Sequence, residues 1–218
     1  VIMTGKYDLV VFDWDGTLVD SKKKIVDCLC AAAEEMELEL SRERASEIIG
    51  LALSVAIGQL FPKMDAEGIG AFIEAYKRHF FAYPTMSELF DGTQSTLEWL
   101  AGFPELFVAV ATGKSRAGLD RELDLFDLRS FFHITRCADE TRSKPHPQML
   151  MEILDYTAVE PGRALMVGDT DFDIEMAHSA GMDSVALTCG AHLEERLKNA
   201  QPRAMLDSVA SLREWLEQ

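Results

Sequence analysis

Basic residues are scarce in this sequence. Its 218 residues include 21 Lys and Arg against 37 Asp and Glu, which gives a formal net charge of −16 at pH 7. Binding to nucleic acid or to an anionic membrane depends on clustered Lys and Arg, so this charge argues against both as the main partner. A chain this acidic that handles an anionic small molecule needs a local cation, such as a metal ion, to overcome its own field.

Long hydrophobic runs are also absent. The longest, such as LFVAVA at 106–111, are far too short to cross a bilayer. No basic start followed by an apolar segment marks a signal peptide. The four cysteines, at positions 28, 30, 137 and 189, show no paired CxxC spacing, so we expect reduced and mostly buried thiols. These absences together predict a cytoplasmic protein.

What the sequence does contain is a series of short apolar runs separated by helix-like stretches. Apolar residues make up 48% of the chain, which is ordinary for a globular protein. The runs are continuously apolar rather than alternating, as in strands buried on both faces. Alternation of strand and helix predicts an α/β fold, a Rossmann-like parallel sheet with helices on both faces. The expected strands are 9–12, 106–111, 131–134, 164–167 and 184–187, and the expected helices are 93–101, 115–125, 147–156, 171–180, 192–199 and 207–217.

One region interrupts this alternation directly after the first strand. Residues 21–83 contain only helix-like patterns, with Ser41 as an N-cap and breaks at Gly50 and Pro62. We therefore expect an α/β core formed by 1–20 and 84–218, with an all-helical cap inserted at 21–83.

Four loops at strand ends carry the polar residues of chemical interest. Ligands of open parallel sheets bind just beyond the carboxyl ends of the strands, so these loops are expected to converge. The first and fourth supply clustered carboxylates, the second a hydroxyl next to a backbone amide, and the third a lysine. The candidate residues are Asp13 and Asp15, then Thr112 and Gly113, then Lys144, and finally Asp169 and Asp173.

These residue types form a coherent chemical set. Asp13 and Asp169 offer oxygen ligands to a hard divalent cation, which suits Mg²⁺. Thr112, the Gly113 amide and Lys144 can hold the remaining oxygens of a phosphate. An aspartate can then attack phosphorus, since phosphoryl transfer depends mostly on positioning and charge neutralisation. Asp15 is placed to protonate the leaving oxygen and later to activate water.

The four segments resemble the signature motifs of the haloacid dehalogenase-like superfamily of hydrolases. The motifs are D-W-D-G-T at 13–17, Thr112, Lys144, and G-D-T-D-F-D at 168–173, and the helical insertion resembles the phosphoglycolate phosphatase-like branch. The resemblance implies that Asp13 is a nucleophile forming an aspartyl-phosphate, and that Asp15 is the general acid and base, with a backbone carbonyl on the metal. It also implies phosphate binding by Thr112 and Lys144, Mg²⁺ binding by Asp169, and orientation of Lys144 or the metal's waters by Asp173.

The spacing within the first motif has its own implication. In an extended segment residues i and i+2 point the same way, so Asp13 and Asp15 are expected to face one ligand while Trp14 points elsewhere, into packing or a hinge. Simpler alternatives stay open for other positions. Thr112 has the residue type of an N-cap, and Asp173 is favourable in a first helical turn by charge alone.

These observations predict a Mg²⁺-dependent phosphatase that hydrolyses a small phosphorylated metabolite, such as phosphoglycolate, as a monomer or homodimer. Dehalogenases of the superfamily lack the second aspartate of the first motif, so Asp15 favours phosphate over halide chemistry. One alternative is a phosphosugar mutase on the same core, although arginine is scarce from 45 to 77. Another is a non-catalytic module phosphorylated on aspartate, which Asp15 and the insertion argue against. TGKS at 112–115 resembles a nucleotide-binding P-loop, but Val108 stands where that motif needs glycine.

Overall fold

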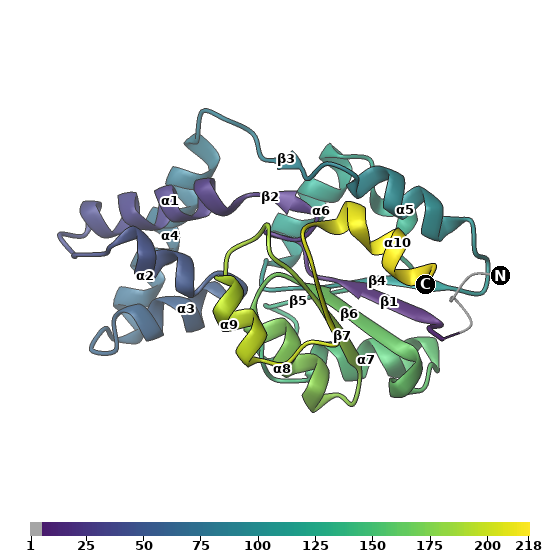
Figure 1. Cartoon of the computed structure of the whole chain (residues 1–218). Helices are drawn as coiled ribbons and strands as arrows, with labels where there is room; N and C mark the ends of the chain where they lie inside the picture. The colour runs from purple at the N-terminus through teal and green to yellow at the C-terminus, as the bar shows by residue number, and fades with distance from the viewer. Residues whose placement is uncertain (1–5) are drawn as a thin grey trace.

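The computed structural model describes residues 6–218 and has a six-stranded parallel sheet at its centre (Figure 1). The strand order is β5-β4-β1-β6-β7-β8, and every pairing is parallel. The predicted α/β class is therefore confirmed. The strands are β1 (Leu9–Phe12), β4 (Phe107–Thr112), β5 (Ile134–Cys137), β6 (Ala164–Gly168), β7 (Asp183–Leu187) and β8 (Ala204–Leu206).

The register of the central strands brings the polar loops together. β1 lies between β4 and β6, and Phe12 at its end pairs with Val110 on one side and Val167 on the other. The loops that follow these three strands therefore leave the same edge of the sheet side by side. This is the edge at which parallel sheets bind ligands.

The sheet is covered on both faces, which explains its continuously apolar strands. Val10 and Phe12 of β1 pack in one cluster with residues of α5, α6 and α10. Leu9 and Val11, which point to the opposite face, pack with residues of α7 and α8. These helices are α5 (Thr93–Ala101), α6 (Arg116–Leu125), α7 (Gln148–Thr157), α8 (Asp171–Ser179) and α10 (Leu212–Leu216). A further helix, α9 (Glu194–Asn199), lies beside the edge of the sheet.

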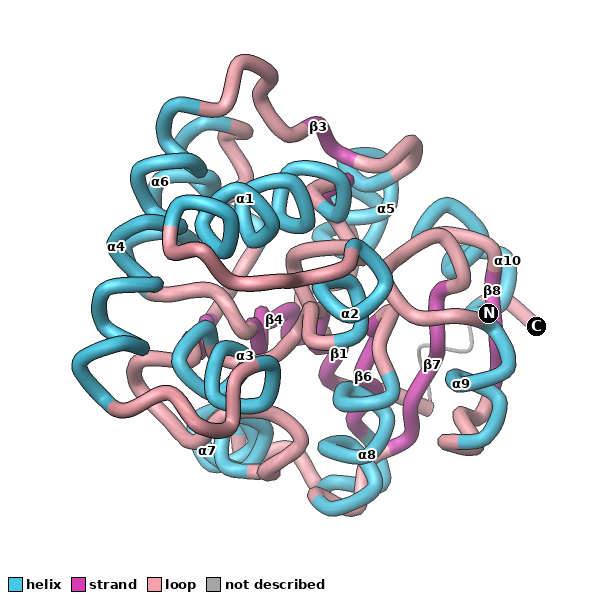
Figure 2. The backbone as a smooth tube through the Cα atoms, turned by 90° about the vertical axis from the view of Figure 1, so that its left-hand side faces the viewer, coloured by secondary structure: helices cyan, strands magenta, loops and turns pink. Residues whose placement is uncertain are grey.

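Four helices occupy residues 22–82, after the first strand of the sheet and before α5. They are α1 (Lys22–Glu35), α2 (Arg42–Glu47), α3 (Leu53–Leu60) and α4 (Ala66–Ala82), referred to below as the helical segment. They share a hydrophobic cluster that includes Leu29, Ile57 and Phe72, which Ala191 joins from the α/β part and against which Phe172 packs. In Figure 1 they lie to the left of the sheet, and Figure 2, viewed from that side, shows α1, α2 and α3 in front of it.

A short antiparallel ribbon joins the helical segment to the rest of the chain. Its strands are β2 (Val19–Asp20) and β3 (Glu88–Leu89), and Val19 pairs with Leu89. The chain thus leaves and re-enters the α/β part at one place. Among the described residues, no helix has the length and apolar character needed to cross a membrane, and the four cysteines are free thiols.

The structure differs from the sequence-based expectation at several elements. The strand expected at 131–134 is β5, at Ile134–Cys137, and the two phenylalanines before it pack from a 3-10 turn, η2 (Arg129–Phe131). β5 is an edge strand that contains Thr135 and Arg136, so it lacks the apolar run of a central strand. β8 was not predicted because only three residues pair. The helix expected at 207–217 is divided into a 3-10 turn, η4 (Val209–Ser211), and α10. Another 3-10 turn, η3 (Pro161–Arg163), precedes β6.

Candidate active site

The candidate site lies beyond the carboxyl ends of the strands, where the predicted loops converge. Asp13 follows β1, Thr112 ends β4 and Asp169 follows β6. Lys144 comes from the loop between β5 and α7, and Asp173 from the first turn of α8. All five side chains are buried, although four of them carry charge. Charged groups are rarely buried without compensation, so this cluster is the candidate functional site.

Three carboxylates and one ammonium group form the centre of the site. Oxygens of Asp13, Asp169 and Asp173 lie within 4.8 Å of one another. Lys144 Nζ lies 2.8 Å from Asp13 Oδ1 and 2.7 Å from Asp173 Oδ1. One ammonium cannot neutralise three carboxylates, so two formal negative charges stay uncompensated in a buried volume. Such a charge is costly unless a cation joins it or protons bind.

The pKa values of these buried groups are shifted by burial and by the same excess of negative charge. Burial raises the pKa of Asp13 well above its usual range, and the charges of Asp173 and Asp169 add to the rise against the opposing effect of Lys144. Burial and the neighbouring Asp173 raise the pKa of Asp169 to about 6. Burial alone would lower the pKa of Lys144, but Asp13 and Asp173 outweigh it and raise that pKa. The lysine is therefore an ammonium ion at neutral pH.

Fixed donors hold two of the carboxylates in place. The Thr17 hydroxyl donates to Asp169 Oδ1 at 2.8 Å, and the backbone N–H of Ala191 donates to Asp169 Oδ2 at 2.6 Å. Asp173 Oδ2 accepts from the Thr170 hydroxyl in a capping box at the start of α8, which leaves Asp173 Oδ1 for Lys144. Asp173 thus stabilises the helix terminus and contacts the lysine with the same carboxylate.

The donor set fits a hard divalent cation. Asp13 Oδ2 is buried and has no hydrogen-bond partner, which leaves a carboxylate oxygen free at the centre of the cluster. The three side chains offer only oxygen, and their uncompensated charge matches that of a divalent ion. Oxygen ligands and few protein contacts are the preference of Mg²⁺.

Asp15 does not belong to this cluster of three carboxylates. Its Oδ1 accepts from the Ser21 hydroxyl at 2.7 Å, and its Oδ2 lies 3.1 Å from Lys114 Nζ. The carboxylate is buried beside the cluster, with partners of its own. Trp14, between the two aspartates, is fully buried, and packing was one of the two expectations for this residue. Its ring lies against that of Phe132, with the two ring centroids 6.1 Å apart.

Thr112 and Gly113 form the loop opposite the carboxylates. The Thr112 hydroxyl accepts from the backbone N–H of Lys114 at 3.1 Å, and the N-cap of α6 is Ser115, so the capping alternative for Thr112 is wrong. A Cβ at Gly113 would lie 2.4 Å from the carbonyl oxygen of Gly50. The turn between α2 and α3 therefore passes directly over this loop, and Gly50 turns it with a φ of +99°.

Other hydrogen bonds join the helical segment to the α/β part around this turn. The Ala52 N–H donates to the Ser143 hydroxyl at 2.9 Å, next to Lys144. The carbonyl of Glu47 lies 3.1 Å from His192 Nε2 and accepts from Arg196 at 3.3 Å. Hydrogen bonds from both backbone and side-chain groups of the helical segment thus reach the loops around the site.

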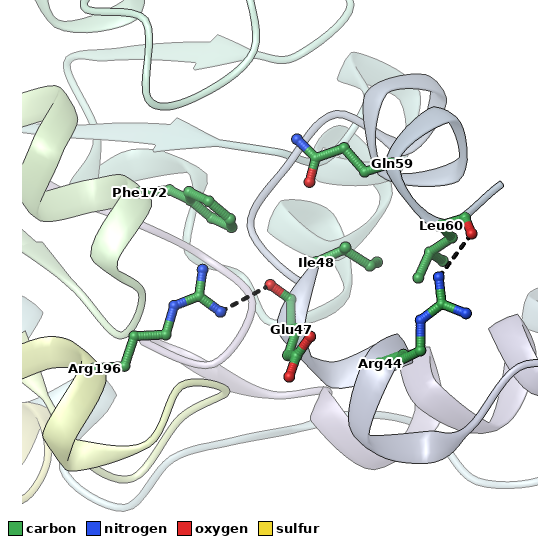
Figure 3. Close-up of a pocket in the computed structure, with 7 residues that line it drawn as sticks. All are labelled: Arg44, Glu47, Ile48, Gln59, Leu60, Phe172 and Arg196. Carbon is green, nitrogen blue, oxygen red and sulfur yellow. Dashed lines mark hydrogen bonds between the residues drawn. The ribbon is translucent and has the colours of Figure 1, made fainter. Parts of the chain in front are cut away.

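A separate open pocket of about 240 Å³ lies at this junction (Figure 3). The figure shows Arg196 of α9 reaching the Glu47 carbonyl and Arg44 of α2 reaching the Leu60 carbonyl. None of its lining residues is one of the predicted site residues. The lining residues are Arg44, Glu47, Ile48, Gln59, Leu60, Phe172 and Arg196.

Several residues of the site were not found from the sequence. Gly190 and Ala191 follow β7, so the rule that ligands bind at strand ends points to them, but their contribution is backbone and carries no side-chain signal. Thr17 was expected only to help the chain turn after the first motif. Lys114 belongs to the second strand-end loop and was given no role there, and Glu122 lies in no motif.

We predict that Gly190→Ala weakens binding of a divalent cation. A Cβ there would lie 2.1 Å from Asp169 Oδ2, so the carboxylate must move from its present position. Displacing or losing the support of a metal ligand typically costs 10- to 100-fold in affinity, and we expect a loss of about that size for Mg²⁺ in calorimetric titrations. Gly162→Ala is the matched control, because nothing lies within 4 Å of its added Cβ. Equal affinities for the two variants would contradict the prediction.

Comparison with known proteins agrees with this site. The family model described as haloacid dehalogenase-like hydrolase matches residues 10–187. The chain is 33% identical over 210 residues to "Probable phosphatase IndB" of Dickeya dadantii, covering 94% of this chain and 91% of that protein. It is 27% identical to a phosphoglycolate phosphatase of Pseudomonas putida, covering 94% and 78% of the two chains. It is 26% identical to the pyrophosphatase PpaX of Bacillus mycoides, covering 95% of each.

The fold is shared with solved structures as well. A predicted phosphatase from Clostridium acetobutylicum superposes with a TM-score of 0.85 at 23% identity, covering 96% of this chain and 97% of the other. The family match includes the loops that carry Asp13, Thr112, Lys144 and Asp169. The chain therefore belongs to the haloacid dehalogenase-like hydrolase family, as one of its phosphatases.

Proposed function

We propose that this enzyme is a Mg²⁺-dependent phosphatase that hydrolyses a small phosphomonoester through an aspartyl-phosphate on Asp13. The observation that carries the proposal is the buried group of three carboxylates and one lysine, in which Asp13 Oδ2 has no partner. That oxygen is both free to react and surrounded by charge that requires a cation. Asp13, Asp169 and the backbone carbonyl of Asp15 would hold Mg²⁺, whose charge, when bound, offsets that of the substrate phosphate.

The remaining residues have roles that follow from their positions. The Thr112 hydroxyl, the Gly113 N–H and Lys144 bind phosphate oxygens, and Asp173 keeps Lys144 in place. A carboxylate oxygen of Asp13 attacks phosphorus, and the bond from phosphorus to the ester oxygen breaks as the new bond forms. Asp15 donates its proton to the departing oxygen. It then removes a proton from the water that attacks phosphorus, which releases inorganic phosphate and restores the Asp13 carboxylate.

We further propose that residues 21–83 act as a cap on a core made of 1–20 and 84–218, the first five of which lie outside the described residues. The turn at Gly50 lies over the Thr112–Gly113 loop, and Ala52 bonds to the loop that carries Lys144. Closure of such a cap excludes water during the first step and opening admits it for the second. The β2–β3 ribbon, where both connections cross, is the hinge.

The space under the turn favours a small substrate. The carbonyls of Gly50 and Leu51 would lie within 2.8 Å of any Cβ at Gly113, so little room separates the two loops. Relatives named phosphoglycolate phosphatase and pyrophosphatase differ in substrate but both names denote small molecules. We propose a small phosphorylated metabolite, with phosphoglycolate as the first compound to try.

The test is phosphate release from a panel of small phosphorylated compounds, reported as kcat/KM. The panel includes 4-nitrophenyl phosphate, phosphoglycolate, pyrophosphate and a hexose phosphate, each with Mg²⁺ and with excess EDTA. We expect turnover of at least one small phosphomonoester with Mg²⁺ and loss of that turnover in EDTA, restored by added Mg²⁺. No phosphate release from any compound, or equal rates with EDTA, would contradict the proposal. Formation of a bisphosphate instead of free phosphate would indicate a mutase.

A further inference from the structure

A buried chain of hydrogen bonds and ion pairs begins at Asp15 and returns to its neighbour in sequence. Lys114 Nζ lies 3.1 Å from Asp15 Oδ2 and 3.4 Å from Glu122 Oε1. The other oxygen of Glu122, Oε2, accepts from Trp14 Nε1 at 2.6 Å. Trp14 precedes Asp15 directly, so the chain of contacts closes on the same short segment of backbone. It joins the end of β1 to the loop after β4 and to α6.

The members of this chain are buried too deeply to be surface pairs. The side chains of Lys114, Asp15 and Glu122 are 10%, 12% and 9% exposed, and Trp14 is fully buried. Burial alone would lower the pKa of Lys114, but Asp15 and Glu122 outweigh it and raise that pKa. Each group therefore depends on its neighbours for compensation. Removing one member leaves the others with an unpaired polar or charged group.

This arrangement leaves the Asp15 carboxylate with a single orientation. Ser21 donates to Oδ1 at 2.7 Å, and Lys114 binds Oδ2, so both oxygens are held. Lys114 cannot follow a rotation of Asp15 without leaving Glu122, which is itself fixed by the indole of Trp14. A proton donor must meet the leaving oxygen at hydrogen-bond distance, and small misplacements are costly in rate.

We propose that Lys114, Glu122 and Trp14 are positioning residues that hold Asp15 in place to protonate the leaving group. This inference rests on the proposed function, because it assigns Asp15 its role as general acid. It makes a specific statement about which substrates depend on these residues. An alkoxide is a poor leaving group and needs the proton, whereas 4-nitrophenolate leaves readily without it. Changing the positioning residues should therefore lower kcat/KM mainly for substrates with poor leaving groups.

The experiment compares benzyl phosphate with 4-nitrophenyl phosphate in wild type and Lys114→Met. Both substrates are small aromatic phosphomonoesters, but they differ in the leaving group. The measured quantity is kcat/KM, which reports the steps up to departure of the leaving group and not the later hydrolysis of the aspartyl-phosphate. We expect kcat/KM to fall about 100-fold for benzyl phosphate, a typical contribution of a general acid, and less than about 5-fold for 4-nitrophenyl phosphate.

Two further variants keep the result interpretable. Trp14→Phe keeps a buried aromatic ring but removes the donor to Glu122 together with part of the ring volume, so it should show the same selective loss on a smaller scale even if Lys114→Met folds poorly. Lys198→Met is the control, because Lys198 is a lysine at an exposed position on α9. The ratio of the two substrates should stay at the wild-type value in this variant.

The outcomes separate the inference from the proposed function. Losses in Lys114→Met and Trp14→Phe that are equal for the two substrates would show a merely structural role and overturn the inference. Unchanged rates in both variants would overturn it as well. A wild-type enzyme that releases no phosphate with Mg²⁺ from these two substrates or from any compound of the panel would overturn the proposed function and the inference with it.

Discussion

Asp13→Asn is expected to abolish phosphatase turnover while the protein stays folded. An amide cannot form the acyl phosphate that the proposed mechanism requires, so we expect kcat to fall by about 10⁴-fold or more. The change is nearly isosteric, and the new side chain keeps an oxygen to accept from Lys144. Single-turnover phosphate release with the wild type's preferred substrate measures the loss. Asp155→Asn, at an exposed position on α7, is the matched control and should retain wild-type rates.

The same variant is expected to gain stability when no metal is present. Burial raises the pKa of Asp13 above that of an unfolded chain, so ionising this group at neutral pH opposes folding. Asparagine carries no charge there, and it relieves repulsion with Asp169 and Asp173. Thermal unfolding in EDTA at pH 7.5 should therefore give a higher Tm for Asp13→Asn than for wild type. Wild-type turnover in the variant would remove Asp13 as the nucleophile, and a strongly lowered Tm would show that our account of the charge balance is wrong.

Lys144→Met is expected to have the largest effect on stability of any single change at the site. Lys144 is the only ammonium in contact with the three carboxylates among the described residues, and its side chain is fully buried. Removing one partner of a buried ion pair typically costs 3–5 kcal/mol, because the other charge stays buried without compensation. We expect a loss of about that size in the free energy of unfolding, measured with urea in EDTA at pH 7.5. Lys63→Met, at an exposed position, should change it by less than about 0.5 kcal/mol.

The pH dependence of this loss follows from the raised pKa values. Asp169, with a pKa of about 6, is ionised at pH 7.5 and largely protonated at pH 5. A carboxyl whose folded pKa exceeds its unfolded value binds more protons in the folded state, so it opposes folding less as the pH falls. The gap between Lys144→Met and wild type should therefore narrow from pH 7.5 to pH 5. A gap that widens on acidification would contradict the view that uncompensated carboxylates cause it.

The positions of the loops that form the candidate site were predictable because the strands that precede them are buried on both faces. Asp13, Thr112 and Asp169 each follow a run with no polar interruption, and parallel pairing brings those ends together. β5 was placed three residues early because an edge strand tolerates Thr135 and Arg136. Whether Asp13 and Asp15 face one ligand stays a prediction. The chain turns directly after Asp15, with Gly16 at a φ of +86°, and Asp15 has Ser21 and Lys114 as partners.

Other features had no signal in the sequence. The N–H of Ala191 binds Asp169, but a backbone donor looks the same in every residue. Glu122 lies on α6, remote in sequence from the first motif, and only the folded structure shows that it receives the Trp14 indole. The four helices of the segment were predictable from their periodicity. Their placement over Thr112 and Gly113 was not, because it depends on contacts between distant parts of the chain.

The central place of β1 in the sheet bears on how the protein is made. Leu9 pairs with Phe107 on one side and Ala164 on the other, so a ribosome must add most of the chain before this strand has both neighbours. The helical segment packs mostly through local contacts, so it can form before β1 has both of its neighbouring strands. During that interval the sequence LVVF is exposed to the cell, and we expect nascent chains of this enzyme to need protection from aggregation until β6 has emerged.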